Sequence, residues 1–556
     1  MRTFVKKLQI FQRALLRVLK NILSNLDRRG FKKYKWIIAA LFLLFFYTFV
    51  FKIYYDRAFS IAFGDEIHEM MSGYLMNKGL GIYQDFFSQH NPATAYFAFF
   101  IQKVLHPDTL YTFILYHRLF VVVFSLALET LLIIRFGKKA ILFTVLFELT
   151  KYYSAGANFQ AESFIAVPCV YLLYLVIKAY KNERLFVIDY FMSVLFAWFI
   201  IVSREPFIPY ALMTFILILI LQMKRDYKAK ISAFFLLVSS LTMTLMMLPL
   251  KSYFFQVFTV NKLVLADDLA RQGGSIVTLF QSFFYPLVIL WSGIFTHFRL
   301  IEVVVTLYFL AIAYYRSMYL KYGRETLLFI VLLGFIYLRP GIAGEQFYGT
   351  YKMLPWWAVY LSILSYFVFD MQKYLLKKNY FSLLFMGSAL FCIVFFSPQS
   401  YLFAPVQRLI EFNTNYNRYV LAGEVMKLIQ KRPTNVKDTL FVQGYDTLVF
   451  FTSNLNSPYP TYFYYGYQNL VPEYREKYEQ LFLKSPPTFY YDDFHECAVK
   501  RSPLTLVPPT VRPHYLAIKF RGDSTCLYIH DSIRADIPQS TRDFIFEKYE
   551  YHIEQP

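Results

Sequence analysis

The chain has 556 residues, of which 57% are hydrophobic and 17% charged, and its mean hydropathy is +0.39. Soluble chains carry roughly 25% charged residues, and the charges missing here are replaced by long apolar runs, which excludes an ordinary soluble or disordered protein. The formal charge of +20 lies in basic loops beside these runs, so membrane topology explains it without a nucleic-acid partner. We therefore expect a membrane protein.

The N-terminal segment, residues 1–35, is strongly basic, with 11 Lys and Arg against the single acid Asp27. Its apolar residues recur at helical intervals, which favours a helix lying on the anionic cytoplasmic surface; a disordered basic tail is the alternative. Residues 36–54 then form an apolar run of about the ~20 residues that a bilayer core requires. We interpret this run as the first membrane span.

Ten later apolar runs predict further spans, at residues 110–134, 140–153, 160–180, 185–203, 206–223, 231–252, 299–315, 326–338, 352–369 and 380–396. Basic connectors separate several of them and should face the cytoplasm. Residues 276–296 are also apolar, but a crossing there would place the later basic loops outside. We interpret them as a re-entrant or interfacial segment. The pattern predicts a polytopic α-helical protein of about eleven spans, with its N-terminus inside and its C-terminus outside.

Two polar regions should then lie on the outer face. The first outer loop, residues 55–109, is much longer than a connector requires. The last region, residues 399–556, contains four runs typical of short strands, at 439–443, 488–492, 515–520 and 526–530. This pattern predicts three parts: the basic segment 1–35, a transmembrane domain over 36–398 and an extracytoplasmic α/β domain over 399–556. Cys497 and Cys526 fall in the last part, where a disulfide between them stays open.

The first outer loop opens with Asp65 and Glu66, directly beyond the first span. Carboxylates at this position cap a helix and complement its dipole. A carboxylate at the mouth of a cavity between spans can also accept a proton from a hydroxyl or amine that attacks a sugar. The two residues by themselves favour the capping interpretation.

A wider pattern surrounds these acids. Gly64-Asp65-Glu66, then GLGIYQD over Gly79 to Asp85, then Gln89-His90-Asn91-Pro92 follow in order along the first loop. Later come Ala161-Glu162 at the start of a span, Val202 to Pro206 at a tight outer turn, and YGTYKMLPWW over Tyr348 to Trp357. In this order the chain resembles the membrane glycosyltransferases with the GT-C fold, among them the protein O-mannosyltransferases and the aminoarabinose transferase of lipid A.

The resemblance implies transfer of a sugar from a polyprenyl-phosphate donor to a glycan, lipid or protein acceptor on the outer face of the membrane. It implies Asp65 as the general base, with Glu66 beside it as a second catalytic candidate. The candidate residues for binding the substrate and the lipid phosphate are Asp85, His90, Glu162, Arg204, Arg339, Tyr348 and Lys352. For the cations, an ion-paired turn or an interfacial anchor is the alternative.

Some residues depart from the family pattern. His90 and Asn91 stand where some relatives have Lys or a second Pro, and Arg204 stands where relatives more often have Lys. The first loop has no Asp-x-Asp, so we expect no metal and no other cofactor, although a divalent metal stays open. The chain also has no Asn-x-Ser/Thr sequon, which favours a bacterial cytoplasmic (inner) membrane.

Two other functions stay open. A secondary transporter places ionisable groups at the bilayer midplane and is often built from two repeated halves. Here the notable charges lie near the outer interface, and no matching halves are apparent. A glycan ligase or polymerase of related fold would use the same chemistry, and only the family resemblance argues against it.

Overall fold

The computed structural model describes most of the helical part of the chain and most of its C-terminal region. The described residues are 35–61, 64–221, 226–263, 297–318, 322–336, 351–375, 406–432, 437–444, 447–458, 471–492, 507, 510–520, 526–549 and 551–554. Several predicted features lie outside them: almost all of the basic segment 1–35, the segment 276–296, the span 380–396, the domain boundary at 398, Arg339, Tyr348 and Cys497.

Residues 1–55 and residues 56–556 form two compact units. The described part of the first unit is helix α2 (Lys35–Asp56), whose residues Ile37–Asp56 have a mean hydropathy of 2.2 and enough length to cross a membrane. The first span predicted from the sequence is therefore a helix of the expected length.

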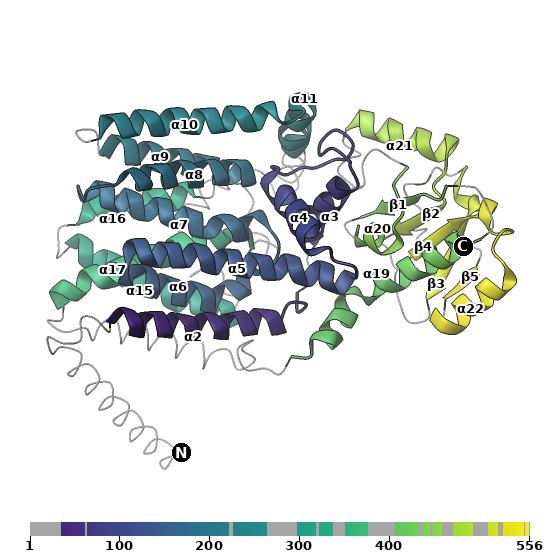
Figure 1. Ribbon diagram of the computed structural model, residues 1–556, viewed down its shortest axis with the longest axis horizontal. Helices are drawn as coiled ribbons and strands as arrows, with labels where there is room; N and C mark the ends of the chain where they lie inside the picture. Colours follow the sequence, from purple (N-terminus) through teal and green to yellow (C-terminus); the bar gives the residue numbers. More distant parts are fainter. Residues whose placement is uncertain are drawn as a thin grey trace, which may run out of the picture. The chain divides into compact units, whose positions relative to one another are not determined.

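Long apolar helices make up most of the second unit (Figure 1). They are α5 (Leu110–Phe136), α6 (Lys138–Thr150), α7 (Ala161–Tyr180), α8 (Val187–Ser203), α9 (Ile208–Leu221), α10 (Tyr227–Met246), α15 (His297–Met318), α16 (Gly323–Phe335) and α17 (Leu354–Leu375). Each falls on one of the predicted spans. Within the described residues, five helical stretches are long and apolar enough to span a bilayer. The polytopic helical architecture is confirmed there, whereas the eleven crossings and their sidedness stay predictions.

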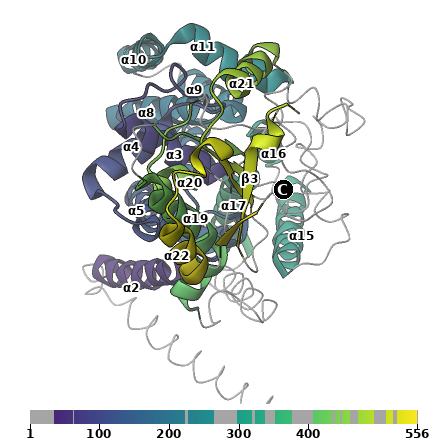
Figure 2. The same ribbon diagram turned by 90° about the vertical axis from the view of Figure 1, so that its right-hand side faces the viewer.

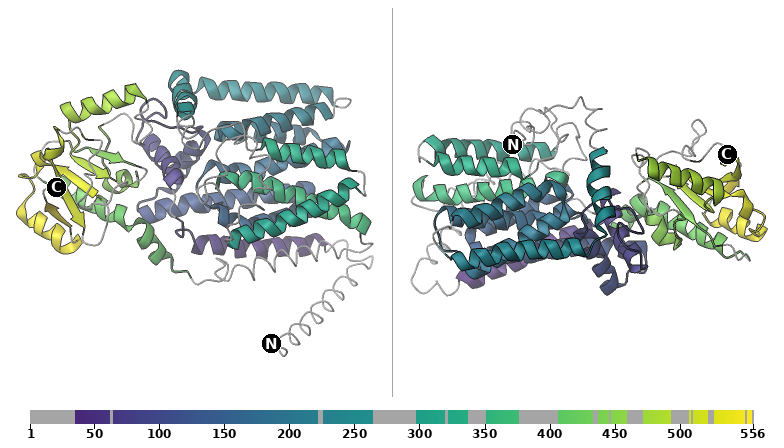
Figure 3. Two further views of the ribbon diagram at one scale, coloured as in Figure 1. Left: turned by 180° about the vertical axis from the view of Figure 1, so that it is seen from behind. Right: turned by 90° about the horizontal axis from the view of Figure 1, so that it is seen from above.

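Helices α7 and α17 form the centre of the bundle. The most apolar stretch of α7 is 89% buried, and that of α17 is 94% buried. The corresponding stretch of α10 is only 17% buried. Figure 2 shows α10 at the periphery, next to the short α11 (Leu250–Phe254). The view from behind in Figure 3 shows α15 to α17 as neighbours. A helix that is apolar on all sides suits the interior of such a bundle.

The first outer loop folds into a pair of helices, α3 (Gly64–Asn77) and α4 (Ala93–Leu105). They cross closely at Gly73, where an added Cβ would lie 2.5 Å from Ala98. Two residues after the end of α3, Gly79 has a φ of +87°, which favours glycine. The two acids at the start of this loop predicted the first of these helices, whereas α4 was not predicted.

The chain between α3 and α4 is fastened by side chains. The Tyr83 hydroxyl donates to the His90 carbonyl at 2.5 Å. Gln256, in the π-helical turn Phe255–Val260, accepts from the Ser88 amide and donates to the Tyr83 carbonyl, both at 2.9 Å. Asn91 donates to the Ile201 carbonyl at 2.8 Å. These bonds hold the His90 segment against the end of α8.

The C-terminal region contains a five-stranded sheet in the order β1-β2-β4-β3-β5. The strands are β1 (Leu440–Gln443), β2 (Phe489–Asp492), β3 (Tyr515–Phe520), β4 (Cys526–His530) and β5 (Tyr551–Glu554). β1 and β2 pair in parallel, and the other pairs are antiparallel. The four predicted strands are confirmed to within one residue. The short β5, at the end of the chain, was missed.

Helices cover this sheet on both faces. They are α19 (Arg408–Gln430), α20 (Leu448–Ser453), α21 (Pro472–Lys484) and α22 (Gln539–Tyr549), and α21 and α22 lie on opposite sides of the strands (Figures 1 and 3). Tyr478 and Phe482 of α21 pack into an apolar cluster with Phe441, Tyr490, Tyr515 and Tyr528 of the sheet. Alternate strand residues point to opposite faces, so each face can bury its own set. The expected α/β fold is confirmed, and its location outside the membrane stays a prediction.

Candidate active site

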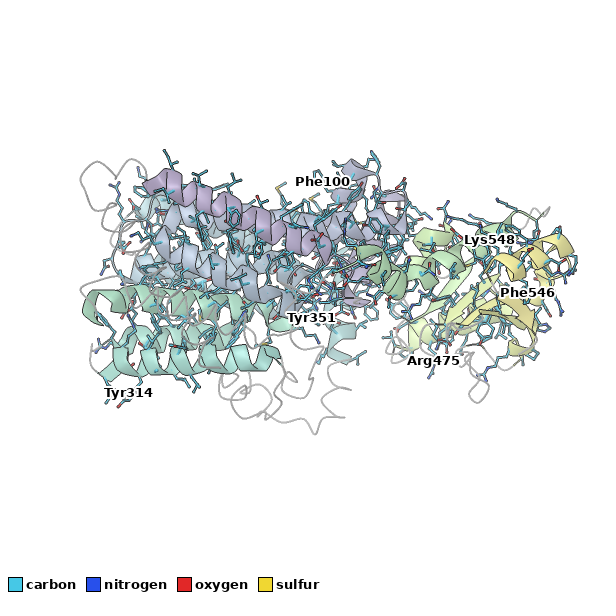
Figure 4. The ribbon with its side chains drawn as sticks, turned by 90° about the horizontal axis from the view of Figure 1, so that it is seen from below. Phe100, Tyr314, Tyr351, Arg475, Phe546 and Lys548 are labelled. Atoms are coloured by element: carbon cyan, nitrogen blue, oxygen red, sulfur yellow. The ribbon has the colours of Figure 1, made fainter. Side chains whose placement is uncertain are left out.

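Asp65 lies in the first turn of α3, and its side chain is partly exposed. The Tyr351 hydroxyl donates a hydrogen bond of 2.5 Å to Asp65 Oδ2 across 286 residues of sequence. Tyr351 belongs to the 3-10 turn Tyr351–Met353 that precedes α17, and Figure 4 labels it at the end of the long helices. Asp65 is therefore held by a side chain from a distant segment, beyond any local capping role.

Glu66 is fully buried and forms an ion pair with Arg118 of α5. The Arg118 Nε–H donates to Glu66 Oε2 at 3.1 Å, and the Phe159 amide donates to the same oxygen at 3.0 Å. Arg118 also donates to the Ala58 carbonyl at 2.5 Å and to the Tyr416 hydroxyl at 3.0 Å. These contacts fix the start of α3. The catalytic role expected for Glu66 stays a prediction, and its contacts are those of a buried structural pair.

Arg204 follows the last residue of α8 and has extended backbone angles. Pro206 cannot continue α8, because it has no amide hydrogen to donate and its ring would clash with the carbonyl four residues earlier; the chain instead turns at Arg204 into the 3-10 turn Glu205–Phe207. The Arg204 Nε–H donates to Glu162 Oε1 at 3.0 Å, and its Nη1 contacts Nδ1 of His90. A guanidinium can only donate, so the His90 Nδ1 must accept. Three residues singled out from the sequence, His90, Glu162 and Arg204, thus form one buried group.

Two residues of α3 that were not among the predicted site residues lie beside this group. The His68 ring stands edge-on to the His90 ring, with centroids 5.6 Å apart. Burial lowers the pKa of His68 to about 3; the Asp65 carboxylate opposes this shift and Arg204 adds to it. Glu69 is only 4% exposed. Burial raises the pKa of Glu69 to about 8; Arg204 opposes this shift, and Glu162, Glu205 and Asp65 contribute to it.

Not all of the remaining predicted site residues lie near the group around Arg204. Asp85 is exposed, and its carboxylate accepts from the Gly81 amide at 2.7 Å, which stabilises a local turn. Lys352 Nζ lies 5.5 Å from the centre of the Tyr351 ring and so stays near the Asp65 side of the group. Arg339 and Tyr348 lie outside the described residues.

Sequence reasoning missed Tyr351, His68 and Glu69. Tyr351 stands next to Lys352 in the YGTYKMLPWW motif, from which Tyr348 was chosen instead. His68 and Glu69 follow Asp65 by three and four residues, the spacing that places side chains on one helix face. Helical spacing from Asp65 was the signal that could have identified both.

Acidic side chains outnumber basic ones around Glu69. Asp65, Glu162 and Glu205 are acids that raise its pKa, and Arg204 is the cation of the described residues that lowers it. Within the described segments, no three His, Cys, Asp or Glu side chains are grouped as metal ligands would be. The expectation of no obligatory metal stays a prediction.

No protein-family model matches the chain, and no curated protein sequence matches it. Two proteins with solved structures similar to it are ArnT and an archaeal oligosaccharyltransferase. ArnT from Cupriavidus metallidurans bound to undecaprenyl phosphate has 11% sequence identity and a TM-score of 0.49, over 89% of this chain and 98% of that one. The Archaeoglobus fulgidus oligosaccharyltransferase tethered with an acceptor peptide has 10% identity and a TM-score of 0.45, over 90% of this chain and 74% of that one.

A second structure of that archaeal enzyme, in complex with Zn and sulfate, has 10% identity and a TM-score of 0.41, over 84% of this chain and 68% of that one. These solved structures belong to the class of protein that the sequence resemblance named, and their TM-scores all lie below 0.5. The residue roles that follow rest on the geometry of this chain.

Proposed function

We propose that this protein is an integral membrane glycosyltransferase that moves a sugar from a polyprenyl-phosphate donor to a glycan, lipid or protein acceptor on the outer face of the membrane. The observation that carries the proposal is the placement of Asp65. Its partly exposed carboxylate is held by Tyr351 and lies close enough to Arg204 to act on the charge of that guanidinium. Arg204 in turn contacts Glu162 and His90 in the buried group.

In the proposed reaction, a hydroxyl or amine of the acceptor attacks the anomeric carbon of the donor sugar. Asp65 accepts the proton of that nucleophile as the new bond forms. The bond from the anomeric carbon to the phosphate oxygen breaks, and the lipid phosphate leaves with the bonding electrons. Arg204 stabilises the charge that develops on this phosphate.

The surrounding contacts support these roles. The Tyr351 hydroxyl orients the Asp65 carboxylate, and the Glu66–Arg118 ion pair fixes the helix that carries it. Glu162 and His90 hold the guanidinium of Arg204, which has more N–H donors than these two contacts use. We assign Lys352 as a second cation near the phosphate, because it lies beside Tyr351.

The membrane explains why such a site belongs at the ends of spanning helices. Moving an isoprenoid chain from the bilayer into water costs ~0.8 kcal/mol per CH₂ group. The donor therefore keeps its chain in the membrane and presents its phosphate at the interface. We propose that the site opens outward from the cytoplasmic membrane of a bacterium.

Turnover by purified protein in lipid vesicles, supplied with a radiolabelled polyprenyl-phosphate sugar, tests the role of Asp65. We expect Asp65→Asn to lower kcat by about 10²–10⁴-fold, because the amide cannot accept the proton. Asp536→Asn, at an exposed C-terminal position, is the matched control and should turn over like wild type. Equal turnover by Asp65→Asn and wild type would remove Asp65 as the base.

The same assay separates a transferase from a glycan ligase. A transferase of single sugars should use a carrier bearing one sugar, whereas a ligase should use only a carrier bearing a preassembled glycan. If the protein preferred the preassembled glycan, the proposed single-sugar donor would be wrong, whereas the role of Asp65 as the base would still hold.

A further inference from the structure

Glu69 is a buried carboxylate to which none of the described residues donates a hydrogen bond. It is 4% exposed and lies one helical turn after Asp65 on α3, so both side chains occupy one face of the helix. Glu66, on the same helix, contrasts with it, because Arg118 and the Phe159 amide satisfy that carboxylate. The two neighbouring glutamates of α3 therefore have opposite environments.

The charged groups that act on Glu69 come from several elements. They are Asp65 on α3, Glu162 at the start of α7, Arg204 at the end of α8, and Glu205 in the 3-10 turn Glu205–Phe207. The Tyr83 hydroxyl, in the loop after α3, is a further titratable neighbour. The basic residue of α4, Lys103, is exposed. Among these described groups, Glu69 therefore shares the guanidinium of Arg204 with three other acids.

This arrangement decides the charge of Glu69. An ionised carboxylate that is buried without a donor and close to other acids is unfavourable, and such a group keeps its proton instead. The raised pKa of Glu69, about 8, agrees with the geometry: burial is the main cause, and the opposing effect of Arg204 is smaller. At neutral pH the side chain is then a neutral acid with one O–H to donate.

We propose that Glu69 is a second acid of this site, which keeps its proton during turnover and donates a hydrogen bond to a phosphate oxygen of the departing lipid carrier. The proposal rests on the function proposed above. Arg204 is held by Glu162, whose negative charge weakens its attraction for a phosphate, and a neutral donor adds stabilisation without a further negative charge. No proton leaves Glu69, so Asp65 remains the group that accepts the proton of the nucleophile.

The test compares two substitutions of Glu69 over a range of pH. Glu69→Gln keeps the shape of the side chain and an N–H donor but cannot ionise, whereas Glu69→Leu keeps the volume and removes the donor. We expect Glu69→Leu to lower kcat by about 10- to 150-fold at neutral pH, the effect of losing a hydrogen bond to a charged group. Glu69→Gln should stay within a few-fold of wild type.

The pH profile supplies the readout that a purely structural residue would not change. In wild type, kcat should fall as the pH rises through about 8, because Glu69 then ionises and repels the phosphate. Glu69→Gln should lose this fall. Glu476→Gln, at an exposed position on α21, is the matched control and should keep the wild-type profile.

Two results would overturn the proposal. If Glu69→Gln were as slow as Glu69→Leu while both unfolded at the wild-type temperature, a negative charge would be required at this position. If Glu69→Gln kept the alkaline fall of wild type, another group would cause that fall.

Failure of the proposed function can be recognised separately. Infrared difference spectra between neutral and alkaline pH report the C=O stretch of a protonated carboxyl group without any turnover. If this band is lost in Glu69→Gln, Glu69 is protonated at neutral pH. If wild type nevertheless transfers no sugar from lipid-linked donors, the proposed glycosyltransferase function is wrong although the protonated state of Glu69 holds. A band that persists in Glu69→Gln would reject the protonated state itself.

Discussion

The buried charges around Arg204 and those around Arg316 differ in how completely they are paired. Arg316 of α15 donates to Asp370 of α17 at 2.5 Å and to Glu325 of α16 at 2.6 Å. The Tyr366 hydroxyl donates to Glu325 at 2.7 Å, and Lys181 lies 3.5 Å from Asp370. Lys139 also acts on the charge of Asp370, so the cations of this network are at least as many as its acids. Among the described groups that act on the charge of Glu69, by contrast, the single cation Arg204 faces three acids, and Glu69 receives no hydrogen-bond donor from the described residues.

This difference separates two uses of buried charge. A balanced network with direct pairs ties three helices together and leaves little for a ligand to contribute. The group near the start of α3 has more acids than cations, and its hydrogen-bonding side chains can bind a substrate. Ionisable groups with perturbed pKa values are typical of functional sites. The proposed active site is therefore the network in which the buried charges are less completely paired.

Removing Arg316 should have the largest effect on stability. Arg316→Met leaves two buried carboxylates without their main partner, and breaking a buried pair costs ~3–5 kcal/mol. We expect a lower unfolding temperature in detergent and unchanged turnover per folded molecule. Arg324→Met, at an exposed position on α16, is the control. A loss of turnover without a loss of stability would show that the Arg316 network is functional.

Removing Arg204 should act chiefly on the reaction. Arg204→Gln removes the cation proposed to face the leaving phosphate, and we expect kcat to fall by about 10²–10³-fold. Arg204→Lys should recover part of the rate, because it keeps the charge but loses the forked geometry. Turnover with the labelled donor, corrected for folded protein, measures both. If an Arg204 variant unfolded at a lower temperature but had normal turnover, the Arg204 group would be structural, like the Arg316 network.

The smallest effect is expected at Tyr351. Tyr351→Phe removes the hydroxyl that orients Asp65 and should cost ~1 kcal/mol of transition-state stabilisation, which is about a fivefold lower kcat. The KM for the donor should change little. Tyr314→Phe, at an exposed position labelled in Figure 4, is the control. A drop as large as that of Asp65→Asn would make Tyr351 a proton donor or acceptor in its own right.

Much of the fold could be predicted because its signals are local. Apolar runs of bilayer length predicted α5, α7 and α10, and alternating apolar residues between turn residues predicted β1 to β4. Helix α4 was missed because its residues, ATAYFAFFIQKVL, follow a polar loop and are shorter than a span. The strand β5 was missed because four residues carry too little pattern.

The candidate site was predicted only in part, for a different reason. Motif order singled out Asp65, His90, Glu162 and Arg204, and Arg204 contacts both Glu162 and His90. The order of motifs could not reveal the bond from Tyr351 or the pairing of Glu66 with Arg118, because both join segments far apart in the chain.

The amino-acid sequence by itself determined that this is a membrane protein with basic connectors, a long first loop beginning with two acids, and a small α/β region near its end. Hydropathy and residue spacing act over one element at a time, so they are readable without coordinates. The tertiary structure alone decided which acid of α3 is paired and which receives no donor from the described residues. That distinction depends on the desolvation and the partners that packing supplies to each carboxylate, and neighbouring residues in the chain do not specify them.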